Sequence, residues 1–325
     1  MINSKISFFS FKNKNTLWFL LILWTNIITF SWAYFVFQGI NLDSFRNKYP
    51  LLDPMRFFAQ SRDLLTTVQP VREELNQIFE EQGLSYTSLY FEYLNTGANI
   101  SVNQDVRILP ASLIKVPLAM AVMKKVEKGD WKLYNQLMLT KEDRDNEWGD
   151  VYKYPIWTPI AIQTLLEEML LNSDNTAYRI LYRNLSMDEV KDVFVALGLE
   201  DFFDQEWKIT AKEYTRLLRS LYTANYINTE HSQFILQILS KTKYDDYLWQ
   251  GIPDDIIFAH KIGENNSKTV ILDAGIVYIW DRVYLISMST DYEKEWISRE
   301  KALELFWTVS KIIYTFISSA KNDSL

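Results

Sequence analysis

The sequence contains no cysteine and only two histidines. The absence of cysteine excludes disulfide bonds, thiolate nucleophiles, thiolate zinc sites and iron–sulfur clusters, because each of these requires that side chain. Two histidines also leave little material for a metal site built from imidazole ligands. We therefore expect no metal and no cofactor, and any nucleophile has to be a serine, a threonine, a lysine or a carboxylate.

An excess of positive charge is missing as well. Among 325 residues, 34 are Lys or Arg and 41 are Asp or Glu, so the net charge is −7. A surface that neutralises phosphate groups needs the opposite sign, and we therefore expect no nucleic-acid partner. Apolar residues make up 48% and charged residues 23%, which is typical of a folded globular protein and not of a disordered or collagen-like chain.

One long apolar run lies near the N-terminus. Residues 16–37 contain no charged side chain. As a helix that rises about 1.5 Å per residue, they are long enough to cross a hydrocarbon layer about 30 Å thick. We expect a single transmembrane signal-anchor there, with residues 1–15 in the cytoplasm, because Lys5, Lys12 and Lys14 precede the run and positive charge stays inside.

The rest of the chain would then be extracytoplasmic and held at the cytoplasmic membrane. Residues 38–58 are predicted to form a juxtamembrane stalk, and residues 59–325 one domain. The alternative is a cleaved signal peptide with a small-residue cleavage site at Ser31 and Ala33, which would make the protein secreted.

The apolar periodicity of the domain predicts an α+β fold. We expect strands at both ends of the domain and helices between them, which indicates an antiparallel β-sheet flanked by helices plus an inserted all-helical lobe. A cleft between lobe and sheet is the expected place for a site. The expected segments are a helix over 71–82, strands over 89–94 and 100–102, helices from 112 to about 239, strands over 256–261, 270–279 and 283–289 with a turn at Asp281 and Arg282, and a helix over 298–319.

Ser112 and Lys115 stand three residues apart at a predicted helix start, so both side chains project from one face. A lysine amine beside a serine hydroxyl makes a nucleophile without histidine, provided that burial or a nearby cation lowers the lysine pKa from about 10.4. The spacing alone is weak evidence. It recurs at Ser240–Lys243 and Ser318–Lys321, to which we assign no role.

Two later segments strengthen the interpretation. Ser173-Asp174-Asn175 lies at the junction of two predicted helices, and Lys261-Ile262-Gly263 lies on a predicted strand. In this order and context they match, with Ser112 and Lys115, the set S-x-x-K, S-D-N and K-T-G. On these residues the domain resembles the class A β-lactamase-related serine hydrolases, a family that includes penicillin-binding proteins, over about residues 71–319.

The resemblance implies a role for each matching side chain. Ser112 would be the acylated nucleophile and Lys115 its proton acceptor. Ser173 would pass the proton to the leaving nitrogen, and Lys261 would add positive potential that attracts an anionic substrate. Asn175 would bind a substrate amide and brace Lys115.

The strand residues carry both expected roles and differences from the family. Gly263 would leave the strand edge open for an extended substrate, and the backbone N–H groups of Ser112 and Glu264 would form the oxyanion hole. With Asn175 and Gly263, the resemblance places Ile262 and Glu264 among the substrate-binding residues. Ile262 replaces a hydroxyl residue that helps bind a substrate carboxylate. Glu264 would place a carboxylate beside the oxyanion unless its side chain turns away. Pro117 should bend the nucleophile helix unless its first turn is irregular.

The largest difference is a missing segment. Class A β-lactamases carry a Glu-x-x-Leu-Asn segment whose Glu activates water for deacylation, and the interval Gly198–Thr210 contains none. Its acidic side chains are interpreted as solvated loop charges; they are Glu200, Asp201, Asp204 and Glu206. Without a general base for water, hydrolysis of an acyl-enzyme would slow by about 10² to 10⁴.

Other chemical signals are weaker. Asp143, Asp145 and Glu147 alternate as in a calcium loop, but the glycine and the final Glu of such a loop are missing. We interpret them as a solvated turn. His231 and His260 are interpreted as neither metal ligands nor a catalytic base.

The sequence thus predicts a membrane-anchored serine hydrolase or acyltransferase. It would form an acyl-enzyme on Ser112 with a β-lactam or a peptidoglycan-type peptide amide outside the membrane, and deacylation would be poor. Two alternatives stay open: a true class A-type β-lactamase, and a catalytically lapsed domain that binds cell-wall peptide or a membrane partner. The second alternative, the lapsed domain, is based on Ile262, Glu264 and the missing loop glutamate. The sequence predicts no oligomeric state.

Overall fold

The computed structural model describes residues 18, 20–32, 34, 68–265, 267, 269–280 and 282–319. The chain divides into two compact units, Met1–Leu64 with Asn322–Leu325, and Leu65–Lys321. In the first unit the described residues are helical. None of the described helices is both long enough and apolar enough for a membrane span. The predicted cytoplasmic segment 1–15, the predicted stalk 38–58 and parts of 16–37 lie outside the described residues, so those statements stay predictions.

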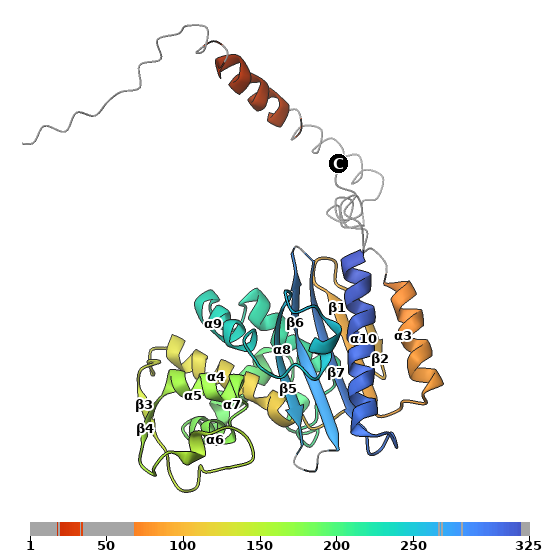
Figure 1. The fold of residues 1–325 in the computed structure, drawn as a ribbon. Helices are drawn as coiled ribbons and strands as arrows, with labels where there is room; N and C mark the ends of the chain where they lie inside the picture. Colours follow the sequence, from red (N-terminus) through yellow and green to blue (C-terminus); the bar gives the residue numbers. More distant parts are fainter. Residues whose placement is uncertain are drawn as a thin grey trace, which may run out of the picture. The chain divides into compact units, whose positions relative to one another are not determined.

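The second unit is built on a five-stranded antiparallel sheet with strand order β2-β1-β7-β6-β5 (Figure 1). The sheet joins the two ends of the unit, because β1 pairs with β7. Its strands are β1 (Thr87–Tyr93), β2 (Ala98–Val102), β5 (Ile257–Glu264), β6 (Val270–Ile279) and β7 (Arg282–Asp291). The predicted fold class, an antiparallel sheet with an inserted helical lobe, is confirmed.

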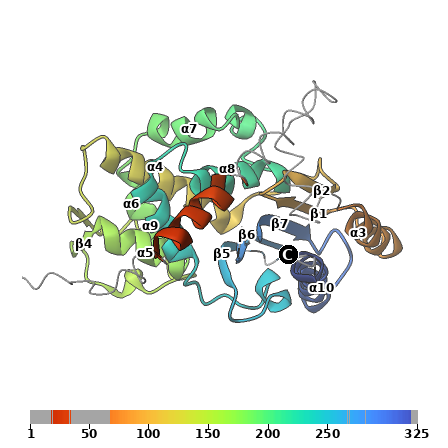
Figure 2. The same ribbon diagram turned by 90° about the horizontal axis from the view of Figure 1, so that it is seen from above.

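Helices cover both faces of this sheet. Helices α3 and α10 lie on one face, while α8 and the helical lobe lie on the other (Figure 2). The α-helices are α3 (Gln69–Glu81), α4 (Lys115–Glu127), α5 (Ile162–Leu171), α6 (Asn175–Arg183), α7 (Met187–Ala196), α8 (Ala211–Thr223), α9 (Thr229–Leu239) and α10 (Arg299–Ser319). Short 3₁₀ helices are η1 (Ala111–Ile114), η2 (Val151–Lys153), η3 (Glu200–Phe202) and η4 (Leu248–Gly251).

Two hydrophobic cores result, one on each face. On β6, Leu272, Ala274 and Ile276 pack toward the lobe, whereas Ile271 and Val277 pack toward α3 and α10. Successive side chains of a strand point to opposite faces, so a sheet covered on both faces reads as a continuous apolar run. The same alternation on β5 decides which of its side chains reach the site.

Most predicted segments are confirmed within a few residues, and two differences remain. Ile279 pairs with Arg282, so Arg282 belongs to β7 and not to the turn. The turn includes Trp280, whose φ of 47° is left-handed. A small sheet of β3 (Gln136–Met138) and β4 (Pro159–Ala161) was not predicted, because three-residue strands are too short to show alternation.

Candidate active site

The turn that carries Ser112 is a 3₁₀ helix, η1, which leads directly into α4. In a 3₁₀ helix, side chains three residues apart eclipse one another, and Lys115 Nζ lies 3.1 Å from Ser112 Oγ. Pro117 stands in the first turn of α4 and has no N–H to give to the Leu113 carbonyl. The Tyr214 hydroxyl donates to that carbonyl instead, at 3.0 Å. The irregular first turn therefore accommodates Pro117 as the sequence required.

The Lys115 amine is buried among oxygen atoms. Nζ lies 2.6 Å from the Ser173 carbonyl oxygen, 2.7 Å from Asn175 Oδ1 and 3.2 Å from Ser173 Oγ. Burial lowers the pKa of Lys115 to about 7, against the opposing effect of the Asp174 and Asp145 carboxylates. The pKa condition that a serine–lysine pair needs is thus met.

These contacts also orient the amine. The Ser173 carbonyl and Asn175 Oδ1 can only accept hydrogen bonds, and they are the two shortest contacts of Lys115. A neutral amine has two N–H groups, and both are used by these acceptors. Its lone pair is then left for the hydroxyl proton of Ser112.

Ser173 lies between two lysines. Its Oγ is 2.9 Å from Lys261 Nζ and 3.2 Å from Lys115 Nζ. Ser173 is buried and has a left-handed φ of 53°, a backbone strain of the kind found at functional sites. Burial and the neighbouring Lys115 lower the pKa of Lys261, despite the Asp273 carboxylate. The two amines therefore disfavour being charged together.

Asn175 is held by a residue to which sequence reasoning gave no role in the site. Its Nδ2 donates to Asp145 Oδ1 at 3.1 Å, which turns Oδ1 of the same amide toward Lys115. Arg179 donates to the other oxygen of Asp145 at 2.6 Å. Only the short spacing from Asp143 had marked Asp145 in the sequence.

The prediction that Asp143 and Asp145 are solvent-exposed turn residues is wrong. The Asp143 side chain is buried, pairs with Arg183 at 2.8 Å and accepts from the Thr140 backbone N–H. The Asp145 side chain is also nearly buried. Each carboxylate accepts hydrogen bonds from an arginine and from an amide group in the folded protein. The spacing of charges in the sequence does not reveal such partners.

Strand β5 divides its side chains between the two faces of the sheet. Lys261 and Gly263 face the lobe, and a Cβ added at Gly263 would lie 2.8 Å from Leu113 Cδ1 and 3.0 Å from the Pro110 carbonyl oxygen. Gly263 therefore lets η1 approach the strand closely. Because β5 is at the end of the strand order, its outer edge has no neighbouring strand among the described residues, which agrees with the predicted open edge.

Ile262 and Glu264 point to the other face. Ile262 is buried in the core beneath α3 and α10 and does not line the cavity, so its predicted contact with substrate is not supported. The Glu264 carboxylate accepts from the Tyr247 hydroxyl at 2.7 Å and from Arg299 at 2.5 Å. The side chain thus turns away from the oxyanion position, as the sequence required.

His260 shares that face with Ile262. Its Nδ1 lies 2.7 Å from Asp273 Oδ1, and both side chains are fully buried. The pair stands on the side of β5 opposite to Lys261, so His260 is not placed to act as a base for Ser112, in agreement with the prediction.

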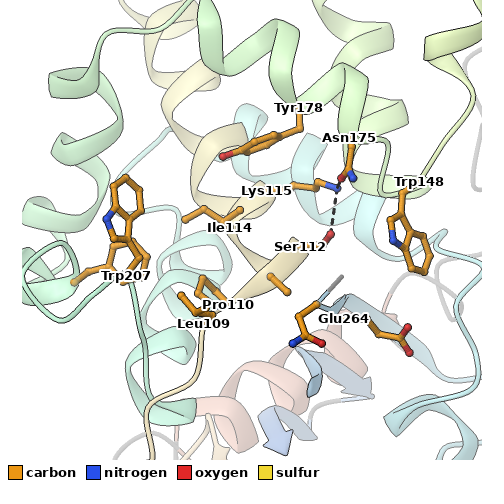
Figure 3. A pocket seen from close by; sticks show the side chains of 13 residues that line it. Leu109, Pro110, Ser112, Ile114, Lys115, Trp148, Asn175, Tyr178, Trp207 and Glu264 are labelled. Carbon is orange, nitrogen blue, oxygen red and sulfur yellow. Dashed lines mark hydrogen bonds between the residues drawn. The ribbon is translucent and has the colours of Figure 1, made fainter. Parts of the chain in front are cut away.

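A cavity of about 360 Å³ opens over Ser112. Figure 3 shows the Ser112 hydroxyl beside the Lys115 amine, with Trp148 on one side and Trp207 on the other. Asn175 also lines the cavity, and so does Glu264, although its carboxylate is bound to Tyr247 and Arg299. Ser173 and Lys261 are buried and do not line the cavity. The aromatic walls were not predicted, since aromatic residues are more often core than site; they are Trp148, Tyr178, Phe202 and Trp207.

The acidic residues of the interval 198–210 do not contribute to the cavity. All four are exposed, and Glu206 pairs with Lys208. Their interpretation as solvated charges is confirmed. The interval instead contributes Phe202 and Trp207 to the wall of the cavity. Aromatic rings, and no carboxylate, therefore line the cavity from this interval.

Known proteins are similar to this chain in sequence and in fold. A profile of the β-lactamase enzyme family matches residues 70–317. The chain is 22% identical over 210 residues to the β-lactamase VEB-1 of Pseudomonas aeruginosa, which covers 56% of this chain and 69% of that protein. The solved structure of PBP-A is similar, with 23% identity and a TM-score of 0.69 over 77% of this chain and 97% of that one. A PBP-A mutant in an acyl-enzyme complex with penicillin G is 22% identical, with a TM-score of 0.68 and the same coverage.

Proposed function

The chain belongs to the β-lactamase enzyme family of serine hydrolases, and within that family we propose that it forms a covalent acyl-enzyme on Ser112. The observation that carries the proposal is the Lys115 amine, 3.1 Å from Ser112 Oγ with a pKa lowered to about 7. A large part of such an amine is neutral at physiological pH and can accept the hydroxyl proton. The substrate is a β-lactam or a peptidoglycan-type peptide amide.

In the first step, Ser112 Oγ attacks the carbonyl carbon and its proton moves to Lys115 Nζ. The carbonyl oxygen becomes an oxyanion, for which the backbone N–H groups of Ser112 and Glu264 are the proposed donors. In the second step the bond from carbon to nitrogen breaks. Ser173 gives its hydroxyl proton to the leaving nitrogen and regains one from the Lys115 ammonium, 3.2 Å away.

Deacylation is proposed to be slow. Among the residues that line the cavity, the acidic one is Glu264, and its carboxylate is occupied by Tyr247 and Arg299. Water that reaches the ester therefore has no free carboxylate to accept its proton, which costs about 10² to 10⁴ in rate. A long-lived acyl-enzyme favours transfer of the acyl group to another acceptor.

The proposed location is outside the cytoplasmic membrane, with residues 16–37 as a single anchor. Support comes from the absence of charge in this run and from the exposed apolar side chains of its described helix, among them Leu21, Trp24 and Phe30. Such side chains suit a lipid environment. If the segment is cleaved, the domain is secreted.

The proposal is tested by intact-mass spectrometry of the full chain in detergent after incubation with penicillin G. The wild type is expected to gain the mass of one penicillin, and the adduct should persist over time. Ser112→Ala should gain none, while Ser240→Ala, which removes the serine of a second S-x-x-K segment, should react as the wild type does.

Other outcomes separate the alternatives. Rapid consumption of penicillin without a lasting adduct identifies a true β-lactamase and contradicts slow deacylation. Absence of both adduct and consumption contradicts acylation by this substrate and favours the lapsed binding domain.

A further inference from the structure

One end of the second unit carries exposed apolar side chains from three elements. Trp280, in the turn between β6 and β7, is 96% exposed, and its φ of 47° is unfavourable for a bulky side chain. Ile257 begins β5, is 58% exposed and pairs with Tyr278 of β6. Tyr222, near the end of α8, is also exposed, and its ring centre lies 6.2 Å from that of Tyr278. We call Tyr222, Ile257 and Trp280 the end patch.

The end patch lies where the chain enters and leaves the unit. Arg282, beside the turn, donates to the Ile317 carbonyl near the end of α10 at 2.9 Å. Pro70 at the start of α3 lines the same groove as Phe316 of α10, and Figure 1 shows these two helix ends at one end of the sheet. Val68, the first described residue of the unit, is therefore at the end of the unit that carries the end patch.

We propose that the end patch rests on the surface of the lipid bilayer in which residues 16–37 are anchored. The proposal depends on the membrane location proposed above and goes beyond it. Tryptophan and tyrosine prefer the interface between lipid and water, where the ring meets an apolar layer and the polar atom meets water. Residues 38–67 extend at most about 3.5 Å each, roughly 100 Å in total, so they keep the patch at a high local concentration near the bilayer.

Charge near the patch indicates which lipid surface fits. Asp254 and Asp255 precede β5 and are exposed at this end. Their negative charges oppose anionic headgroups. Arg282, beside the turn, adds one positive charge at the same end. The charges therefore give little net attraction to anionic headgroups, and the contact is apolar and interfacial.

Docking in this orientation sets the distance between the active site and the bilayer surface. The patch includes Ile257 at one end of β5, and the cavity includes Glu264 at the other. Seven residue-to-residue steps of strand, at about 3.3 Å each, separate Ile257 from Glu264 by roughly 23 Å. The cavity then lies at the end of β5 that is farther from the bilayer, on the side of a polymer or solute outside the membrane.

The test uses the absence of cysteine. A single Thr223→Cys substitution places one environment-sensitive fluorophore at the exposed end of α8, beside the patch. The labelled full chain is reconstituted in phosphatidylcholine vesicles with and without lipid that carries a quencher close to the headgroup. Quenching is expected, and a further Trp280→Ser substitution should abolish it.

Trp296→Ser is the matched control. Trp296 is 94% exposed with a φ of 57°, but it follows β7 at the opposite end of the sheet, so its loss should leave quenching unchanged. If the chain sediments with the vesicles and the fluorophore is not quenched, or if Trp280→Ser has no effect, the docking is overturned while the anchor stands. A chain that does not sediment overturns both. Penicillin adduct formation reports on Ser112 separately and should be unaffected by Trp280→Ser.

Discussion

At the scale of single residues, the chemistry depends on what surrounds one amine. Lys115 touches two oxygen atoms that only accept hydrogen bonds and two hydroxyl groups. Burial favours its neutral form, while the carboxylates of Asp174 and Asp145 favour its ammonium form. The balance leaves a base whose pKa is close to the working pH, where general-base catalysis is most effective.

Asp145 orients Asn175, which accepts a hydrogen bond from this amine, and its negative charge also acts on the amine directly. Its substitution tests the effect of the charge. Asp145→Asn removes a negative charge that raises the pKa of Lys115, so the pKa should fall further below its ordinary value. The acylation rate is then expected to reach its plateau at a lower pH than in the wild type. Stopped-flow measurements of acylation by a chromogenic β-lactam, from roughly pH 5 to pH 9, give the midpoint of this pH dependence.

Asp143→Asn provides the control for that shift. Asp143 is buried and paired with Arg183, so its loss should lower the melting temperature, but it is not among the charges that act on Lys115. A midpoint that moves equally in both variants, or that stays fixed in Asp145→Asn, would contradict the effect of the Asp145 charge on the pKa of Lys115.

At the scale of elements, the site depends on how closely η1 approaches β5. Alternation along the strand sends Lys261 and Gly263 to the lobe face and Ile262 and Glu264 to the α10 face. This alternation was available from the sequence, since a strand has a period of two. The assignment of Ile262 to the substrate followed the family pattern and overlooked that period.

A methyl group at Gly263 should separate these two elements. In Gly263→Ala the new Cβ would meet Leu113 and the Pro110 carbonyl, so η1 has to shift and carry Ser112 with it. Displacement on the order of 1 Å costs roughly 10- to 100-fold in rate. Adduct formation measured at 25 °C, together with the melting temperature, tests this loss.

Gly275→Ala is the comparison within the same sheet. Its Cβ would meet His260 and the Ala259 carbonyl, and no atom of η1 is among its nearest neighbours. It should destabilise the protein without a comparable loss of acylation per folded molecule. Equal acylation in Gly263→Ala and the wild type would show that the close approach is not needed.

At the scale of the whole molecule, the two ends of the domain form one sheet, and the helices between them form the lobe. That architecture followed from the order of strand and helix patterns, and the S-x-x-K, S-D-N and K-I-G segments located the cluster of Ser112, Lys115, Ser173 and Lys261. The sequence did not reveal Asp145 or the aromatic walls. Their roles arise from elements far apart in the chain that meet at one site, such as Trp207, which lines the same cavity as Ser112. A local sequence pattern does not reveal such an arrangement.

The central claim is that neutral Lys115 activates Ser112, and the pH profile of wild-type acylation tests it most directly. The lone pair is free only above the pKa of Lys115, which burial lowers to about 7. The second-order rate constant for adduct formation should therefore rise about tenfold per pH unit at low pH and level off above about pH 7. A rate constant that does not change through pH 7, or that falls as pH rises, would contradict the assignment of Lys115 as the base.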